Sequence, residues 1–152
     1  MDVKSRLAEL EIALPPAPQP VGAYVPAVRS GKLVMTSGQL PTSDGKLAAT
    51  GKVPTDVSAA DAAGAARQAA LNALAALAAE SGGVERIARI LRVNVYVACA
   101  PQFTDQATVA NGASELLVEL FGEAGRHTRC AIGVAALPLN APVELDIVAE
   151  LK

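Results

Sequence analysis

An alanine-rich segment, Ser58–Glu80, constrains the fold of this chain more than any other stretch. Alanine is the strongest helix former, and Ser58 with Asp61 three residues later is typical of a helix N-terminus. Ser81-Gly82-Gly83 then ends the helix. The apolar side chains form one narrow stripe of small and medium residues: Ala66, Ala70, Ala73, Leu74 and Leu77. A stripe of such small side chains predicts a helix that lies close against a sheet.

The remaining periodic segments predict strands that come in pairs, with a second long helix at Phe103–Phe121. Apolar and acidic residues alternate most clearly in the last of these strands. A turn at Ser30-Gly31 joins the first two, since glycine accepts the positive φ of a tight hairpin. The expected strands are Tyr24–Arg29, Lys32–Ser37, Ile87–Ala98, Arg129–Leu137 and Val143–Leu151. This β-β-α-β-α-β-β order predicts an α+β fold with both helices on one face of a single mixed sheet.

The N-terminal residues predict an addition to this core. Apolar residues recur at helical spacing in Val3–Leu10. The prolines that follow forbid helix and favour a stiff, extended arm over Leu14–Pro20. The length of 152 residues is typical of one domain. We therefore expect residues 1–152 to form a single domain, with residues 1–20 as its N-terminal helix and proline-rich arm.

The strand expected at Arg129–Leu137 is apolar on both of its faces, because Ala131, Ile132, Val134 and Ala135 follow one another closely. Helices cover only one face of the predicted sheet, so the second apolar face needs another partner. An apolar surface of this kind is typical of an association site. The sequence therefore predicts a homo-oligomer in which copies of the chain cover this face.

Charge and aromatic content argue against nucleic acid as a partner. The formal net charge is −2 and aromatic residues make up 3% of the chain, whereas nucleic-acid binders present basic patches and stacking side chains. The apolar runs are shorter than the roughly 18 residues of a membrane span, and the N-terminus lacks a signal-peptide pattern. Cys99 and Cys130 lie outside any CxxC motif and fit a reducing compartment. We expect a cytoplasmic protein without nucleic-acid or membrane partners.

Few residues suggest a reactive centre, and a metal site is not expected. One histidine and two scattered cysteines do not make a zinc site, and the glycines lack phosphate-binding spacing. His127 precedes a predicted strand and is typical of a surface or loop-edge residue. Cys130 follows Arg129, but adjacent strand residues point to opposite faces. Cys130 is therefore expected to be a core residue rather than an activated thiol.

Arg129 and Glu144 remain as candidates for a polar site. The five-residue turn between the last two strands leaves Arg129 far from the turn and Glu144 close to it. One subunit therefore does not easily bring the two side chains together, whereas two subunits can. Arg129 alone also fits a surface residue or an intersubunit salt bridge, and at this point these interpretations stay open.

Several stretches, in order, resemble the RidA/YjgF family. Val21-Gly22-Ala23-Tyr24-Val25 is similar to its GPY segment, and the letters MTSGQLP at positions 35–41 closely resemble its TSGQ-x-P strand end. Asn111 lies where the family has a helix asparagine. The spacing from Arg129 through Leu137-Pro138 to Glu144 agrees with the closing R, LP and E signature of the family without a gap.

The resemblance implies a chorismate mutase-like fold and a homotrimer with a central barrel and clefts between subunits. It also implies hydrolysis of reactive 2-imino and enamine acids, such as 2-aminoacrylate and 2-iminobutanoate, to 2-keto acids and ammonia without a cofactor. By position, Arg129 would bind the substrate carboxylate and Glu144 would activate the attacking water. The implied substrate pocket also contains Tyr24, Ser37, Asn111, Cys130 and Ala131.

The chain departs from the family at Cys130-Ala131, where relatives often show Ser-Cys. If only the backbone carbonyl at position 131 orients water, Ala131 can serve in place of the cysteine. The same residues also fit a non-catalytic trimer that binds small carboxylates or regulates another process. A ribonuclease activity, a label attached to some relatives, conflicts with the acidic charge and the scarcity of aromatic residues.

Overall fold

Five strands form one mixed sheet in the order β1-β2-β7-β5-β6. The computed structural model describes residues 2–20 and 22–152. β5 and β6 pair in parallel, and the other neighbours in this sheet pair antiparallel. A separate hairpin joins β3 (Thr42–Ser43) to β4 (Lys46–Leu47). The strands of the main sheet are β1 (Ala27–Ser30), β2 (Leu33–Thr36), β5 (Ile87–Ala98), β6 (Thr128–Val134) and β7 (Val143–Leu151).

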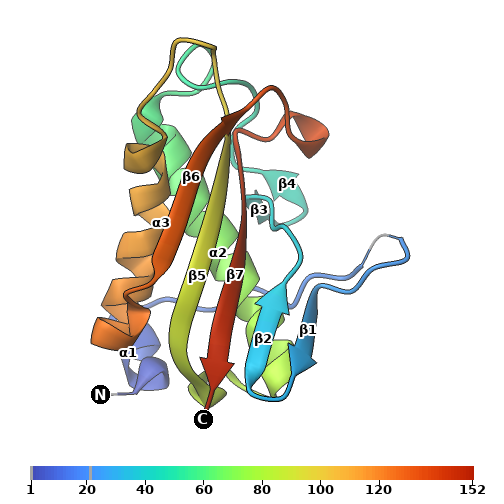
Figure 1. Cartoon of the computed structure of the whole chain (residues 1–152), viewed down its shortest axis with the longest axis vertical. Helices are drawn as coiled ribbons and strands as arrows, with labels where there is room; N and C mark the ends of the chain where they lie inside the picture. Colours follow the sequence, from blue (N-terminus) through green and yellow to red (C-terminus); the bar gives the residue numbers. More distant parts are fainter. Residues whose placement is uncertain (1, 21) are drawn as a thin grey trace.

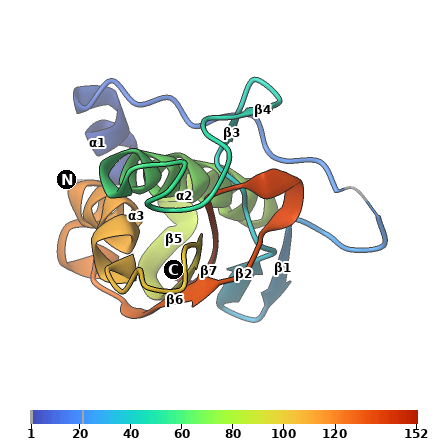
Figure 2. The ribbon, with the colours of Figure 1, turned by 90° about the horizontal axis from the view of Figure 1, so that it is seen from above.

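Two long helices, α2 (Ala59–Ser81) and α3 (Gln106–Phe121), cover one face of this sheet (Figures 1 and 2). Helix α2 lies over β7, and α3 packs beside α2 on the side of β6. The remaining helical segments are α1 (Val3–Glu9) and the 3-10 turns η1 (Val84–Arg86), η2 (Gly122–Gly125) and η3 (Pro138–Asn140). The predicted α+β class, the element order and the one-sided helix layer are confirmed.

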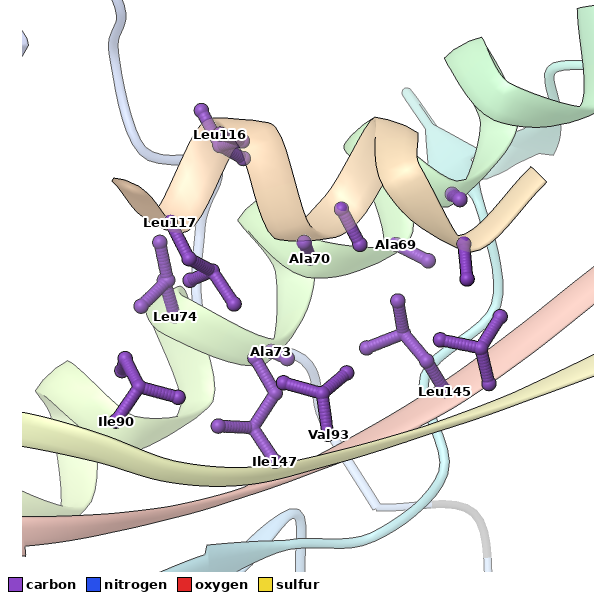
Figure 3. Close-up of a cluster of buried hydrophobic side chains, with 14 of the residues drawn as sticks. Ala69, Ala70, Ala73, Leu74, Ile90, Val93, Leu116, Leu117, Leu145 and Ile147 are labelled. Atoms are coloured by element: carbon purple, nitrogen blue, oxygen red, sulfur yellow. The ribbon is translucent and has the colours of Figure 1, made fainter. Parts of the chain in front are cut away.

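Helix α2 begins and ends where the sequence predicts. The amide of Asp61 donates to Oγ of Ser58 at 3.0 Å, and Gly82 takes the left-handed conformation with φ 81° that closes the helix. All five residues of the predicted alanine–leucine stripe are fully buried. Figure 3 shows part of this stripe, Ala70, Ala73 and Leu74, in the cluster that contains Val93 and Ile147 of the sheet and Leu117 of α3.

The two long helices approach each other so closely that one position admits no side chain. A Cβ atom added at Gly112 would lie 2.6 Å from the carbonyl carbon of Ala63. Real Cβ atoms do not come this close to backbone, so the glycine lets α3 lie against α2. This contact sets how closely α3 lies against α2, directly beside Asn111.

Four expected strand boundaries were too generous, since β2 also ends at Thr36 rather than Ser37. Strand β6 ends at Val134 rather than Leu137, because its partner β5 ends at Ala98, opposite Val134, and residues beyond it have no strand to pair with. Strand β1 begins at Ala27, after Pro26, which has no N–H to donate to a ladder. Strand β2 starts at Leu33, and the turn between these two strands lies at residues 31–32, one residue later than predicted.

Helix α3 begins at Gln106, three residues after the predicted start. The side chain of Phe103 packs against the core from the preceding turn, whose backbone closes by a 3.0 Å bond from the amide of Phe103 to the carbonyl of Ala100. Phe103 therefore contributes to the apolar pattern without being helical.

The predicted N-terminal helix and extended arm are both present. Val3 and Leu7 of α1 are buried, and residues 12–20 have no regular secondary structure. The arm passes outside α2, on the side away from the sheet, and Leu14 packs against the core (Figure 2). Met1 and Val21, the first residue of the Val21–Val25 stretch, lie outside the described residues.

None of the helices in the described part of the chain covers the second face of the sheet (Figure 1). Along β7, alternate residues are buried under the helices and the others, such as Asp146 and Val148, are half-buried on this open face. Val28, Met35 and Ile132 are exposed there. A polar network crosses its centre, in which Asn94 donates to Asp146 at 2.9 Å and Arg92 donates to Asn94 at 3.0 Å. The apolar residues fit the predicted association face, which a single chain leaves uncovered.

Candidate functional site

Arg129 lies near the start of edge strand β6 and points to the face that the helices cover. Its Nη1 donates to Oδ1 of Asn111 at 2.8 Å and to Oγ of Ser114 at 3.1 Å. Asn111 and Ser114 are three residues apart on α3, so both lie on the side of the helix that faces β6. The helix thus holds one end of the guanidinium with two oxygen acceptors.

These two bonds use both hydrogens of Nη1. A guanidinium also offers a second donor edge, formed by Nε–H and Nη2, whose geometry matches the two oxygens of a carboxylate. Within residues 2–20 and 22–152, no hydrogen bond or ion pair engages this edge of Arg129. Arg129 is therefore oriented by its own chain and still has a bidentate edge to offer.

His127 continues the same network. Its Nδ1 lies 2.6 Å from the carbonyl oxygen of Gly125, and its Nε2 lies 3.0 Å from Oγ of Ser114. Burial, and less strongly the nearby Arg129 charge, lowers the pKa of His127 below its ordinary value, although the bond to the Gly125 carbonyl opposes the shift. His127 does lie at a loop edge, as expected, but it is half-buried with both ring nitrogens engaged.

Glu144 lies elsewhere, at the start of β7 on the open face. Its carboxylate borders a cavity of about 300 Å³. The other lining residues come from the N-terminal arm, the segment before β1, the segment after β2, and the turn before β7: Pro18, Gln19, Tyr24, Pro26, Gly38, Gln39, Leu40, Thr42 and Pro138. Three of the stretches that carry the resemblance thus meet at this one cavity.

Gly38 lets the Glu144 carboxylate lie directly on the backbone. A Cβ atom at Gly38 would overlap Oε1 of Glu144 and lie 2.9 Å from its Cδ. The next residue, Gln39, exchanges two backbone hydrogen bonds with Leu145, at 2.7 and 3.1 Å. This bridge fixes the segment after β2 beside Glu144, and the close approach of the carboxylate requires a glycine at position 38.

Burial raises the pKa of Glu144, and the neighbouring Asp146 charge adds to the effect. Within residues 2–20 and 22–152, no donor is bonded to this carboxylate. A carboxylate that is partly desolvated and not stabilised by donors is a stronger base than one on open surface. Glu144 is therefore suited to accept a proton.

Tyr24 and Ser37 lie on the Glu144 side. Tyr24 lines the cavity and is 53% exposed. The hydroxyl of Ser37 donates to the carbonyl of Val25 at 2.6 Å, and its amide donates to the carbonyl of Pro26 at 2.8 Å. These two bonds of Ser37 therefore hold the segment that carries Tyr24. The Ser37 hydroxyl already donates its hydrogen to the Val25 carbonyl.

Cys130 is exposed, so the expectation of a core cysteine is wrong. It does point to the face opposite Arg129, as the strand alternation predicts, and Nη2 of Arg92 lies 3.1 Å from its sulfur. The expectation failed because the open face is not covered within one chain. Ala131 points to the same face as Arg129 and packs against the core.

One chain does not bring Arg129 and Glu144 together. Arg129 pairs with Val93, which pairs with Ile147, and Glu144 lies three residues from Ile147 along β7. An odd number of residues along a strand reverses the face, so the two side chains point to opposite sides of the sheet. Strand rise and spacing put their Cα atoms about 14 Å apart. The structure thus contains two separate half-sites, one around Arg129 and one around Glu144.

Sequence reasoning did not identify Ser114 or Gln39 as parts of these half-sites. The spacing of Asn111 and Ser114 on one helix face was the available signal for Ser114. The proline-rich arm is an addition expected beside the entry strand of Tyr24, where it could narrow the pocket, and Pro18 and Gln19 line the Glu144 cavity together with Tyr24.

The described residues contain no cluster of three or more histidine, cysteine or acidic side chains arranged to hold a metal ion. None of the helices they form has both the length and the apolar character that a membrane crossing requires.

A family model described as "YjgF/chorismate mutase-like, putative endoribonuclease" matches residues 4–151. Protein TCP17 of Trypanosoma cruzi is 43% identical over 151 residues, which cover 99% of this chain and 94% of that protein. The 2-iminobutanoate/2-iminopropanoate deaminase of Escherichia coli K12 is 32% identical over 138 residues, 91% of this chain and 94% of that protein.

Among solved structures, the crystal structure of Agrobacterium tumefaciens protein Atu1372, a protein of unknown function, superimposes with a TM-score of 0.90. The two are 45% identical, and the match covers 99% of this chain and 92% of that one. The similarity therefore extends over the N-terminal arm as well as the sheet and helices.

Proposed function

This chain belongs to the YjgF/chorismate mutase-like family, and from this membership and its two half-sites we propose that it hydrolyses 2-imino acids to 2-keto acids and ammonia. The reaction would take place in clefts between the subunits of a homotrimer. The observation that carries the proposal is Arg129, held at Nη1 by Asn111 and Ser114, while no residue in the described ranges 2–20 and 22–152 engages its Nε and Nη2 edge. The similarity to a 2-iminobutanoate/2-iminopropanoate deaminase supports the choice of substrate class.

Arg129 would bind the substrate through its carboxylate. Two parallel N–H···O bonds to one carboxylate fix both its position and its plane. The carbon next to the carboxylate, which carries the imine nitrogen, would then have a defined place relative to the rest of the cleft. Positioning of this kind lowers the barrier of a reaction that already proceeds slowly in water.

Glu144 would act as the general base. Its raised pKa and lack of donors within the described residues favour proton acceptance from a water molecule. The water oxygen would attack the imine carbon as its proton moves to Glu144, and the proton would next pass to the nitrogen. The resulting carbinolamine would give its hydroxyl proton to Glu144, which would pass it to the nitrogen as the carbon–nitrogen bond breaks, so that ammonia leaves and the carbonyl of the 2-keto acid forms. Every atom comes from the imine and one water, so no redox partner is needed.

The separation of the half-sites supports a cleft shared by two subunits. Arg129 is on edge strand β6, and Glu144 is on the open face of the sheet. A neighbouring chain that covers the open face could bring its own edge strand to the Glu144 cavity. The exposed residues Val28, Met35 and Ile132 on that face provide apolar area for such contact.

A second function uses Arg129 alone. All of the bonds that orient this guanidinium come from its own chain, so carboxylate binding does not require Glu144. The trimer could then bind a small 2-keto acid without turnover. Calorimetry with 2-ketobutyrate that shows saturable, Arg129-dependent binding, together with no deaminase activity, would favour this function over hydrolysis.

The deciding experiment couples the protein to a threonine dehydratase and follows 2-ketobutyrate after threonine is added. We expect wild type to accelerate its appearance and Arg129→Ala to match the time course without added protein. Arg126→Ala is the matched control, because Arg126 lies three residues away and its side chain is 67% exposed beside Glu123. Equal time courses for wild type and Arg129→Ala, or a monomer by light scattering, would contradict the proposal.

A further inference from the structure

The single histidine of the chain is held in one protonation pattern by its neighbours. Nδ1 of His127 lies 2.6 Å from the carbonyl oxygen of Gly125, and a carbonyl can only accept a hydrogen bond. Nδ1 must therefore carry the proton. In the neutral ring, Nε2 is then an acceptor, and the hydroxyl of Ser114 at 3.0 Å is its donor.

This arrangement determines how Ser114 faces Arg129. Once the Ser114 hydroxyl donates to His127, the lone pairs of its oxygen remain for other donors. Nη1 of Arg129 lies 3.1 Å from that oxygen and takes this place. A serine inside a helix commonly bonds the carbonyl four residues earlier, but the bonds of the Ser114 hydroxyl are to His127 and Arg129.

The far end of the chain of bonds is rigid. Gly125 is buried, and a Cβ atom at this position would lie 2.6 Å from the carbonyl carbon of Leu117 on α3. The Gly125 carbonyl therefore has a fixed place relative to the helix that carries Ser114. The series of hydrogen bonds from Gly125 through His127 and Ser114 to Arg129 thus begins and ends on backbone that packs against α3.

We propose that His127 and Ser114 are positioning residues for Arg129, in which the imidazole orients the Ser114 hydroxyl and the hydroxyl oxygen orients the guanidinium. This alignment would turn the Nε and Nη2 edge toward a carboxylate, and that purpose rests on the proposed function. The alignment itself is a property of the free protein and can be measured without any ligand.

The first test is nuclear magnetic resonance on ¹⁵N-labelled protein without ligand. The chain has one histidine, so its two ring nitrogen shifts need no assignment. They should report a neutral ring protonated at Nδ1. The Nε–H signal of Arg129, identified by its loss in Arg129→Lys, should show a rigid heteronuclear NOE that falls in both Ser114→Ala and His127→Phe. A ring protonated at Nε2, or an NOE unchanged in both variants, would overturn the proposal.

The second test measures the dissociation constant of 2-ketobutyrate by calorimetry, together with KM and kcat for the imine. Ser114→Ala and His127→Phe should each weaken binding and raise KM by about tenfold, the lower end of what losing one hydrogen bond to a charged group costs, with kcat changed by less than about twofold. Their double variant should be no worse than either single one, because both act through the same bond. His127→Gln, which keeps an acceptor for Ser114, should recover part of the affinity.

Additive losses in the double variant would show that His127 and Ser114 act independently and would overturn the proposal. Thermal melts of each variant identify a loss of folding. If wild type neither binds the keto acid nor hydrolyses the imine, the proposed function fails, while the resonance experiment still decides the positioning network.

Discussion

The Arg129 half-site and the Glu144 half-site differ in how the chain treats the charged group. Arg129 is held by two oxygens from α3, one of which is bonded in turn to His127. Glu144 has no donor within residues 2–20 and 22–152 and lies partly desolvated on the backbone of Gly38. Hydrogen bonds stabilise and orient the Arg129 guanidinium, whereas the Glu144 carboxylate lies in an environment that favours its protonation.

This difference matches the two roles in the proposed reaction. A binding group works best when its geometry is fixed before the ligand arrives, because less conformational entropy is then lost. A general base works best when its charged form is not overstabilised, because it must take up a proton. If Arg129 binds the substrate and Glu144 accepts the proton, substitutions in the two half-sites should have different effects.

The largest effect should come from combining two inactive variants. Arg129→Ala and Glu144→Gln chains carrying different tags can be co-expressed and purified through both tags. In any mixed trimer, one of three clefts would pair an intact Arg129 with an intact Glu144 from the other chain, so about one third of wild-type activity should return. Mixed trimers as inactive as the parent variants would mean that the residues do not act across a subunit boundary.

Glu144→Gln alone should lower kcat by about 100-fold with little change in KM, since it removes the base and keeps the shape. Its melting temperature should equal or exceed that of wild type. Because folding raises the pKa of this carboxyl, the native state binds the extra proton more tightly than the unfolded state. Glu144 therefore lowers stability as the pH rises from 4.5 through its raised pKa, and glutamine removes this penalty.

The matched control is Glu150→Gln, which removes the same charge from the same face of β7. It should leave kcat near the wild-type value. A clear loss of stability in Glu144→Gln, or an equal loss of activity in the control, would contradict the role assigned to Glu144.

Gly38→Ala should lower kcat by about tenfold, because the added Cβ displaces the Glu144 carboxylate and a small misplacement of a base is costly. The affinity for 2-ketobutyrate, which depends on Arg129, should change little. Gly64→Ala is the control: it has open space around it on α2, and alanine favours helix there. Normal turnover in Gly38→Ala would show that Glu144 does not need its present place.

The smallest effect concerns pH. Activity should fall as the pH drops through the raised pKa of Glu144, because the protonated acid cannot accept another proton. Burial is the main cause of that raised pKa, and the Asp146 charge is the second. Asp146→Asn should therefore move the acid limb of the kcat profile to lower pH. Asp44→Asn, in the β3–β4 turn, should not move it, because Asp44 is not one of the residues that line the Glu144 cavity.

The helices and strands could be read from the residues because each depends on neighbours along the chain. Val143–Leu151 alternates strictly, and β7 has those bounds. Ser58 and Gly82 carry the start and stop of α2 in their own chemistry. Two of the errors, at Phe103 and at residues 135–137, arose because an apolar side chain was read without knowing whether a helix or a partner strand would extend to it.

The half-sites lay partly within reach of sequence reasoning. Arg129 and Glu144 could be identified from their residue types and from the spacing between them. Their separation within one chain followed from the hairpin that joins their strands. The exposure of Cys130 could not, because it depends on which face of the sheet the helices leave open.

Residue order along the chain was sufficient for periodicity, caps and turns, since these involve groups only a few positions apart. The bonds from Arg129 to Asn111 and Ser114, and the meeting of Gln19 with Glu144 at one cavity, join segments that are 15 to 125 residues apart. Such contacts depend on the packing of α3 against β6 and of the arm over α2. They are set by how closely whole elements approach, and that distance is established only when the core is assembled.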